Sequence, residues 1–330
     1  MKKILLYILI FVLICFSIPI LFTNNKVQNV AKQENPINEI IQSNYDYKNY
    51  QIIKLLHVET NQIEEIKLDE YLYGVVSSEM PANFEKEALK AQAVVARTYT
   101  IYKIKNNSEK HNGAHICDNS ACCQAWISKE KRLERWEETV RNSNWDKIVQ
   151  AVNETQGKII TYQNEPINAF FHSNSGGMTE TTANVWGGTG YPYLQTVETS
   201  GEDAYTQYHS EVVLTKQTFI DKIKEKHSNF QIDFSKEDCI RVLEYTEGNR
   251  IKKIQIGNLE LSGVEIRTLL GLKSANFKIS IENENVKLEV IGYGHGVGMS
   301  QTGADSMAKK GSTYEEIIKH FYTGVEITNM

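Results

Sequence analysis

Residues 71–100 have the sequence YLYGVVSSEMPANFEKEALKAQAVVARTYT, in which an apolar stretch is followed by a long helical pattern. Apolar side chains recur at helical spacing after Asn83, a good N-cap residue, and predict a helix that reaches Lys105. Residues 72–76 fit either a short strand or a helical turn. The segment therefore predicts a helix with one apolar face, preceded by a short apolar element.

Glu79 lies at the end of that short strand-like element, immediately before the helix. We expect a carboxylate in this position to be partly desolvated, which disfavours its charged form and raises its pKa. A carboxylic acid that keeps its proton near neutral pH can protonate a leaving oxygen. An ordinary acid at a helix start is the alternative interpretation, since Asp and Glu are common in first turns.

The rest of the chain shows short strand and helix patterns in mixed order. Hairpins are predicted at residues 51–68 and 277–292, and further strands at 158–162, 166–172 and 250–256. Helices are predicted at residues 145–155, 215–226, 262–270, 301–310 and 313–321. Because repeated βαβ units are absent, the pattern predicts an α+β fold with mixed helices and antiparallel hairpins around a substrate groove.

The N-terminus contains an uncharged apolar stretch from Ile4 to Phe22, preceded by Lys2 and Lys3. About 20 apolar residues span a bilayer as a helix. The stretch predicts an uncleaved transmembrane anchor at residues 4–22, with residues 1–3 in the cytoplasm because lysines favour that side. A cleaved signal peptide is the alternative, but no small-x-small site follows.

Two further parts follow the expected anchor. Residues 23–49 are rich in Asn, Gln, Lys and Glu, which predicts a flexible tether. Residues 50–330 then form the expected extracytoplasmic domain. The net charge of −5 argues against a nucleic-acid partner, which would normally require a basic patch.

Five potential metal ligands fall within thirteen residues: His111, His115, Cys117, Cys122 and Cys123. Zinc is usually held by three or four nitrogen and sulfur ligands, and His111 with the three cysteines supplies four. A disulfide is the alternative, because the domain is expected outside the membrane. A metal with four such ligands would be structural, since no coordination position would stay open for catalysis.

Two loops carry further polar residues. The sequence HSNSGG at residues 172–177 places a serine beside a histidine, but it lacks the Gly-x-Ser-x-Gly elbow of a serine nucleophile. Residues 292–298 have the sequence GYGHGVG, whose spacing differs from a dinucleotide fingerprint. We expect these glycines to let the backbone approach another chain or ligand closely, and we expect His295 to be exposed and able to orient a sugar. A purely structural loop is the alternative interpretation.

Lys90 and Arg97 lie on one stripe of the long helix, together with Lys86. They are placed to meet an anionic or polar chain near Glu79, although a solvated helix face is the simpler interpretation. Cations close to Glu79 would lower its pKa. Either burial of Glu79 outweighs them, or they point toward a ligand.

Several of these blocks occur together and in the same order in one known family. They are SSEMP (77–81), EALKAQAVVARTY (87–99), FHSNSGGMTE (171–180), VWGG (185–188), PYL (192–194) and GHGVGMSQTGA (294–304). With them the chain resembles the stage II sporulation protein D family from about residue 55 to residue 323. The resemblance implies a lytic transglycosylase that cleaves peptidoglycan glycan strands between N-acetylmuramic acid and N-acetylglucosamine and leaves 1,6-anhydro ends.

The resemblance also implies a setting. Such an enzyme acts during forespore engulfment, on strands that a partner amidase has stripped of stem peptides, beside a membrane scaffold protein. The expected location is the cell membrane, with a single span and the catalytic domain on the mother-cell side of the septum.

Site residues follow from the resemblance position by position. Glu79 matches the catalytic acid, and residues implicated in substrate binding or activity are matched by Lys90, Arg97, Tyr193, Tyr162 and Tyr322. Clostridial members of the family hold zinc in a similar loop, so the resemblance implies zinc at His111, Cys117 and Cys123. Cys122 stands where histidine is more usual.

Three other functions are compatible with parts of the sequence. A hydrolysing glycosidase would need a second carboxylate, for which Asp69, Glu70 and Asp203 are the candidates. A zinc amidase would use the His/Cys cluster, but catalytic zinc needs an open position. A non-catalytic glycan-binding or amidase-enhancing module is the third alternative, because a related family is described as modifying amidase action.

Overall fold

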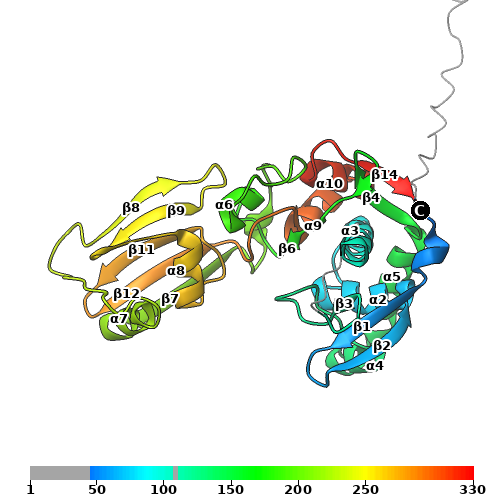
Figure 1. Cartoon of the computed structure of the whole chain (residues 1–330), viewed down its shortest axis with the longest axis horizontal. Helices are drawn as coiled ribbons and strands as arrows, with labels where there is room; N and C mark the ends of the chain where they lie inside the picture. The colour runs from blue at the N-terminus through cyan, green and yellow to red at the C-terminus, as the bar shows by residue number, and fades with distance from the viewer. Residues whose placement is uncertain (1–44, 107–110) are drawn as a thin grey trace, which may run out of the picture. The chain divides into compact units, whose positions relative to one another are not determined.

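The computed structural model describes residues 45–106 and 111–330, which fall within one compact unit, Gln42–Met330 (Figure 1). The anchor predicted at residues 4–22 and most of the predicted tether lie outside the described residues. Among the helices that the structure describes, none has the length and apolar character needed to cross a bilayer.

The predicted α+β class is confirmed (Figure 1). The helices are α2 (Leu68–Glu79), α3 (Lys86–Lys105), α4 (Lys129–Arg135), α5 (Arg141–Glu154), α6 (Thr182–Trp186), α7 (Lys216–Lys224), α8 (Gly263–Leu270), α9 (Gln301–Lys309) and α10 (Tyr314–Phe321), with 3-10 turns η1 (Tyr47–Tyr50) and η3 (Glu202–Ala204). The strands are β1 (Ile52–His57), β2 (Gln62–Lys67), β3 (Ile116–Cys117), β4 (Lys158–Tyr162), β5 (Glu165–Pro166), β6 (Phe171–His172), β7 (His209–Thr215), β8 (Ile240–Tyr245), β9 (Ile251–Ile256), β10 (Leu259–Leu261), β11 (Phe277–Glu282), β12 (Asn285–Ile291), β13 (Met299–Ser300) and β14 (Glu326–Asn329).

Helix α3 is the centre of the larger core. It is buried from Ala88 to Ile101 except at Lys90, so it has no solvent face over this length, whereas the sequence predicted only one apolar face. A helix that is covered all round belongs in the middle of a core. Its alanines let α2, α5, α9, α10 and β4 pack closely around it, and Figure 1 shows it end-on among them. The predicted cap is wrong, since Glu85 rather than Asn83 precedes the first turn.

The segment before α3 is helical rather than strand-like. Leu68, Leu72, Val75 and Val76 recur at helical spacing and are all buried, and α2 ends at Glu79. Met80 leaves the helix with an extended backbone (φ −125°, ψ 136°). The proline that follows it disfavours a helical conformation there, which explains why the helix ends at Glu79.

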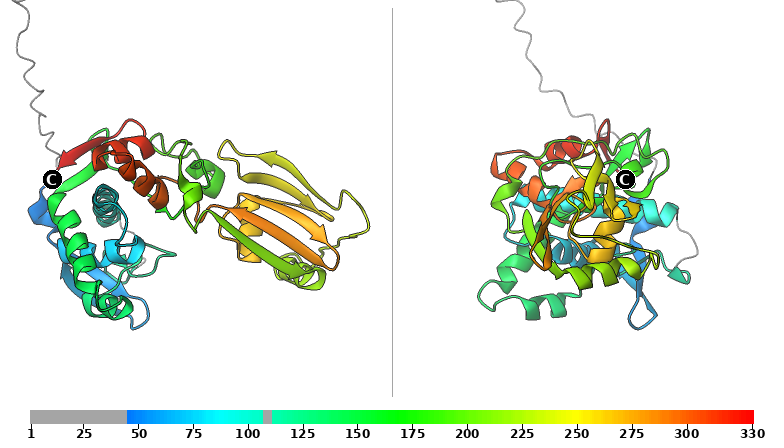
Figure 2. Two further views of the ribbon diagram at one scale, coloured as in Figure 1. Left: turned by 180° about the vertical axis from the view of Figure 1, so that it is seen from behind. Right: turned by 90° about the vertical axis from the view of Figure 1, so that its left-hand side faces the viewer.

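Residues 209–291 form an insertion with its own hydrophobic core (Figure 2). Two antiparallel three-stranded sheets, β10-β9-β8 and β11-β12-β7, pack with α7 and α8. The predicted hairpin is confirmed as β11 and β12, and the predicted helix at 262–270 as α8. Ser262 caps α8 with its side chain, and Gly271 ends it in the left-handed conformation (φ 70°).

The two glycine-containing loops of the sequence lie against each other. Strands β6 and β13 pair in parallel, and a further bridge joins Asn174 to Tyr293. All four glycines from Gly292 to Gly298 have positive φ. A Cβ atom at Gly298 would lie 2.0 Å from the carbonyl oxygen of Phe170. The predicted close approach of the backbone is therefore confirmed, and the segment approached is the part of the same chain around Phe170.

A buried carboxylate, Glu202, ties these loops together. Its two oxygens accept hydrogen bonds from two backbone N–H groups and four hydroxyls, which belong to Ser175 (N and Oγ), Gly177 (N), Thr199, Ser300 and Thr302. Burial alone would raise the Glu202 pKa, but these donors hold it below its ordinary value. Ser300 is also the N-cap of α9, so Glu202 fixes the start of that helix.

Replacing Glu202 by alanine should strongly destabilise the protein. Six donors would lose their acceptor inside the core, and we expect the free energy of unfolding to fall by at least about 3 kcal/mol. Denaturant unfolding measures this loss, with Asp203→Ala as the control. Asp203 is the exposed neighbouring acid, so its replacement should change stability by less than about 0.5 kcal/mol. Equal effects of both substitutions would contradict the role assigned to Glu202.

Candidate active site

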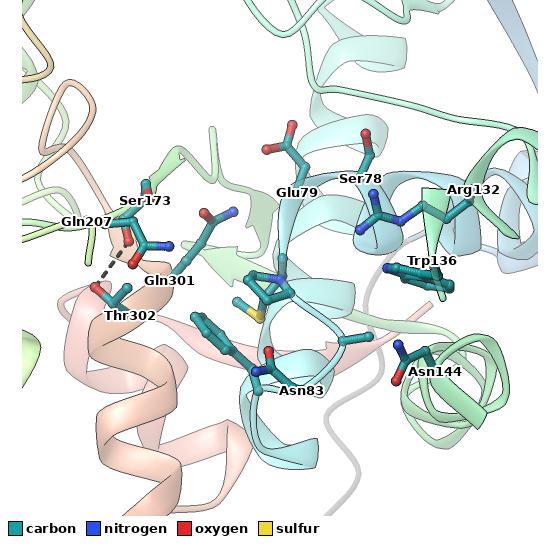
Figure 3. Close-up of a pocket in the computed structure, with 14 residues that line it drawn as sticks. Ser78, Glu79, Asn83, Arg132, Trp136, Asn144, Ser173, Gln207, Gln301 and Thr302 are labelled. Atoms are coloured by element: carbon teal, nitrogen blue, oxygen red, sulfur yellow. Dashed lines mark hydrogen bonds between the residues drawn. The ribbon is translucent and has the colours of Figure 1, made fainter. Parts of the chain in front are cut away.

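Glu79 projects from the C-terminal end of α2 into a cavity of about 490 Å³ (Figure 3). Arg132 and Trp136 lie on one side of it and Gln301, Thr302 and Ser173 on the other (Figure 3). The backbone N–H of Ala125 donates to its Oε1 at 2.5 Å. The carboxyl group is therefore partly covered, and a single backbone donor holds it in place from the loop after the cysteines.

Burial raises the pKa of Glu79 to about 7, although hydrogen bonds from Ala125 and Gln301 act in the opposite direction. The C-terminal end of a helix also carries partial negative charge, which disfavours an ionised carboxylate there. The groups that set the pKa of Glu79 include no cation. The site therefore presents a carboxyl group that is protonated about half the time at neutral pH.

The cavity with Glu79 continues into two others. One, of about 520 Å³, shares Glu79, Ser173 and Gln301 with it. The other, of about 610 Å³, shares Pro81, Asn83, Phe84 and Gln207. Because the three cavities share lining residues, they adjoin one another, and we call them together the trough. Glu79 lines two of them, and a row of adjoining cavities suits a chain-like ligand better than a small one.

Glu79 is the only Asp or Glu side chain among the described residues that line these three cavities. The candidate second carboxylates lie elsewhere: Asp69 contacts Arg97 and Tyr47, and Glu70 pairs with Lys67. Asp203 is exposed and lines none of the three. The arrangement thus offers one carboxyl group for acid–base chemistry.

His295 lines the 520 Å³ cavity beside aromatic residues. Its ring centroid lies 5.1 Å from that of the exposed Trp186, which also packs on Phe170 at 4.8 Å. The expectation that His295 is exposed is wrong, since it is half-buried. Burial lowers its pKa well below the ordinary value, and Nδ1 accepts the N–H of Val297 at 3.0 Å. The neutral ring therefore keeps its proton on Nε2.

Lys90 and Arg97 line none of the three cavities. Lys90 pairs with Glu87 at 2.7 Å and Glu154 at 2.8 Å. Arg97 has no solvent exposure and donates to the carbonyl oxygens of Thr155, Lys158 and Val152. Two of these carbonyls belong to the end of α5, where a cation is favoured by the helix dipole. The structure thus places Arg97 as a support between α3 and α5.

The three tyrosines predicted to bind substrate line none of the three cavities. Tyr193 is buried, stacks on Tyr191 at 5.3 Å and approaches Tyr162 at 5.5 Å. Tyr322 is fully buried and donates to the carbonyl oxygen of Phe170 at 2.7 Å. Since Phe170 lines the cavity with His295, Tyr322 fixes its wall from behind.

His111, Cys117, Cys122 and Cys123 come together as predicted, with all four ligand atoms within 4.8 Å of one another. His111 Nε2 lies 3.4 Å from Cys122 Sγ and 3.5 Å from Cys123 Sγ, and the two sulfurs are 4.0 Å apart. Tetrahedral zinc requires about 3.5 Å between nitrogen and sulfur and about 3.8 Å between sulfurs. The donor set fits zinc, and the cysteines are free rather than disulfide-bonded. His115 is not part of the cluster.

The cluster also forms part of the trough, because Cys122 and Cys123 line the 520 Å³ cavity. Gln124 follows directly and is buried, and its amide donates to Tyr71 and Thr100 at 2.9 Å each. Ala125, which contacts Glu79, comes next. One loop therefore joins the His/Cys cluster to the carboxyl group.

Three residues of this region were missed by the sequence analysis: Arg132, Gln301 and Glu202. Arg132 precedes Trp136 by four residues on a short helical pattern, a spacing that brings side chains together. The sequence alone could therefore have predicted that Arg132 lies beside Trp136. The position of Glu202 depends on contacts between segments about 100 residues apart, which no local sequence pattern predicts.

The trough defines a class of site: a place for a chain-like ligand with a protonatable carboxyl group in its wall. Comparison with known proteins gives the family. The family model described as "SpoIID: Stage II sporulation protein" matches residues 57–162. Stage II sporulation protein D of Bacillus subtilis (strain 168) is 37% identical over 278 residues, 84% of this chain and 78% of that protein. Its counterpart in Bacillus amyloliquefaciens is 34% identical with the same coverage.

The chain belongs to the stage II sporulation protein D family, as its sequence motifs predicted. A further relative, named "Amidase enhancer", from Bacillus subtilis (strain 168), is 30% identical over 78% of this chain, but only 40% of that relative is covered.

Replacing Arg97 by methionine should lower stability rather than act first on ligand binding. The substitution leaves Asp69 and three carbonyl groups without their buried cation, and we expect a loss of about 3–5 kcal/mol in the free energy of unfolding. Lys90→Met is the matched control on the same helix, with an expected loss below about 1 kcal/mol. An Arg97→Met protein of unchanged stability that no longer binds glycan would instead make Arg97 a ligand contact.

Proposed function

We propose that this protein is a lytic transglycosylase of sporulation. It cleaves peptide-stripped peptidoglycan glycan strands between N-acetylmuramic acid and N-acetylglucosamine and leaves 1,6-anhydro ends, during forespore engulfment. The observation that carries the proposal is Glu79, the one carboxyl group that the described residues contribute to the trough, with a pKa of about 7. Family membership supports the cell-wall setting.

One carboxyl group can perform both proton transfers. Protonated Glu79 donates to the glycosidic oxygen as the bond to C1 of the muramic sugar breaks. Ionised Glu79 then accepts the proton of that sugar's C6 hydroxyl, whose oxygen attacks C1 and closes the anhydro ring. A pKa near 7 suits both steps, because neither form of Glu79 is strongly favoured. The N–H of Ala125 stabilises the ionised form between the two steps.

The absence of a second carboxylate in the described trough favours this route over hydrolysis. A typical glycoside hydrolase positions two carboxyl groups about 5–9.5 Å apart across the scissile bond. An intramolecular nucleophile needs no such group, since its effective concentration is already high. The exposed ring of Trp186 offers an apolar face to a sugar, and His295 packs beside it in the same cavity.

The remaining expectations belong to the same proposal. Residues 4–22 anchor the protein in the cell membrane, and the domain acts on the mother-cell side of the septum beside its partner amidase and a membrane scaffold protein. Lys90, Arg97, Tyr162, Tyr193 and Tyr322 support the trough through the elements that they hold together. His295 contacts substrate directly.

Zinc is proposed as a structural cofactor at His111, Cys117, Cys122 and Cys123. It would supply four coordination bonds that order the loop and no chemistry in the reaction, because the four ligands fill a tetrahedral shell. Burial raises the pKa of the Cys123 thiol to about 12 without the metal, so zinc must displace protons when it binds.

The first test is product analysis with the purified full chain and peptide-free glycan strands. We expect 1,6-anhydro ends from the wild-type protein and at least a hundredfold slower cleavage by Glu79→Gln. The rate should fall above about pH 7, tenfold per pH unit, because Glu79 must enter the reaction protonated. Mass spectrometry identifies the ends.

Each other outcome assigns a different function. Hydrated ends would identify a hydrolase and require a second carboxylate. Glycan binding without cleavage by either protein would support a binding or amidase-enhancing module, the function that the name of one relative indicates for that relative.

Removing zinc should affect stability more than chemistry. We expect a chelator to lower the Tm by several degrees, because the loop loses its coordination bonds. The cleavage rate at low temperature should change less, because Gln124, the residue before Ala125, keeps its hydrogen bonds to Tyr71 and Thr100. Metal analysis should find one zinc per chain, and Cys123→Ser should abolish it. A chain with no bound metal and a Tm insensitive to chelator would rule out the site.

A further inference from the structure

Within the described part of the chain, Arg132 is a cation of the trough that pairs with no anion and makes no hydrogen bond through its side chain. Its Nε is buried and has no hydrogen-bond acceptor. None of the ion pairs or side-chain hydrogen bonds of the described residues involves its guanidinium. The guanidinium lies over the ring of Trp136, 4.5 Å from its centroid, so stacking fixes its plane while its remaining N–H groups stay available.

The other cations that line the trough have acceptors. Lys309 pairs with Asp305 at 2.7 Å, and Lys310 donates to Ser200. Arg267 donates to the carbonyl oxygen of Leu272 at 3.4 Å. Among these cations of the described trough, Arg132 alone makes no hydrogen bond or ion pair with another described residue.

Arg132 is not the counterion of Glu79. The Glu79 pKa is raised by burial and lowered by Ala125 and Gln301, and Arg132 is not among the groups that set it. Burial and the neighbouring Arg135 instead lower the pKa of Arg132, which shows that its surroundings do not compensate its charge. A half-buried guanidinium without an anion is costly, and an anionic ligand would remove that cost.

The charge of the whole trough agrees with an anionic chain. The protein has a net charge of −5, yet the described residues that line the three cavities include four cations, Arg132, Arg267, Lys309 and Lys310, and one carboxyl group, Glu79. A polymer with regularly spaced negative charges would meet cations along its length. Arg132 and Arg267 each line a cavity together with Glu79, and Arg267 already donates to the carbonyl oxygen of Leu272, which leaves Arg132 as the better candidate for an anionic ligand.

We propose that Arg132 binds the lactyl carboxylate of an N-acetylmuramic acid unit and thereby selects strands from which stem peptides have been removed. This inference rests on the proposed function and names the group that sets its substrate preference. The carboxylate exists only after the peptide is cleaved, because in intact peptidoglycan the same carbon forms a neutral amide. A planar guanidinium binds a carboxylate through two parallel hydrogen bonds and gains much less from an amide oxygen.

The position of α4 supports a role in recognition. Ser128 caps this seven-residue helix with its side chain, and the helix packs against α2 and α5. Figure 3 shows Arg132 on the wall that faces Gln301 across Glu79, with Ser78 and Asn144 on the same side. These polar groups are suited to the hydroxyl and acetamido groups of the same sugar.

Binding measurements without turnover test the inference. The full chain with Glu79→Gln is titrated with peptide-free glycan strands and with the same strands after their lactyl carboxyl groups are converted to methylamides. We expect about tenfold tighter binding of the carboxylate strands. Adding Arg132→Met should reduce the ratio to about one and leave binding of the amide strands within a factor of three. Arg135→Met, an exposed arginine on the same helix, should keep the tenfold ratio.

Two results would overturn the inference: a preference that survives Arg132→Met, or equal weakening of both ligands in a variant whose Tm is unchanged. If Arg132→Met does not fold, the test is the salt dependence of the affinity ratio between carboxylate and methylamide strands, measured with the Glu79→Gln protein. The tenfold ratio must then fall as salt rises, and a ratio independent of salt contradicts an ion pair.

The proposed function and this inference fail separately. Anhydro products from the Glu79-containing chain, together with no carboxylate preference, would retain the lytic activity and remove the anion site. A preference that depends on Arg132, in a chain that makes no anhydro ends, would retain the anion site and remove the lytic activity.

Discussion

The structure depends on one buried carboxylate, Glu202, and on the six donors that surround it. A buried charge is tolerated in a core only when it is compensated. Here the compensation comes from segments near residues 175, 199 and 300, which are far apart in the sequence. Ser300 begins α9, and Gln301 follows it directly. The wall that faces Glu79 is therefore positioned by a carboxylate that takes no part in the trough.

The same region connects the insertion to the rest of the domain. Arg250, nearly fully buried, donates to the carbonyl oxygens of Ser175 and Met178. A Cβ atom at Gly296 would lie 2.2 Å from its guanidinium, so only glycine fits there. The glycines of this loop thus serve close packing between backbone segments and a buried arginine. They resemble a nucleotide-binding fingerprint only in composition.

The sequence predicted most of the helices and hairpins and the two groups that define the site, Glu79 and the His/Cys cluster. It did not predict that residues 68–79 form a helix, because a short apolar run fits both structures, and the deciding contacts are tertiary. Helical spacing placed Lys90 and Arg97 on one stripe correctly. It could not show that the stripe faces α5, so that Arg97 is buried against backbone carbonyls.

The placement of Glu79 explains how a single carboxyl group can serve as acid and base. Burial and the end of α2 favour the protonated form, whereas the Ala125 N–H favours the ionised form. Burial outweighs the hydrogen bonds and raises the pKa of Glu79 to about 7, so at neutral pH neither proton transfer is strongly uphill. The pKa is set by burial and by neutral hydrogen-bond donors, the Ala125 N–H and the Gln301 side chain, rather than by a neighbouring charge. Arg132 can therefore carry its positive charge in the same cavity and bind an anionic substrate without serving as the counterion that would hold Glu79 ionised.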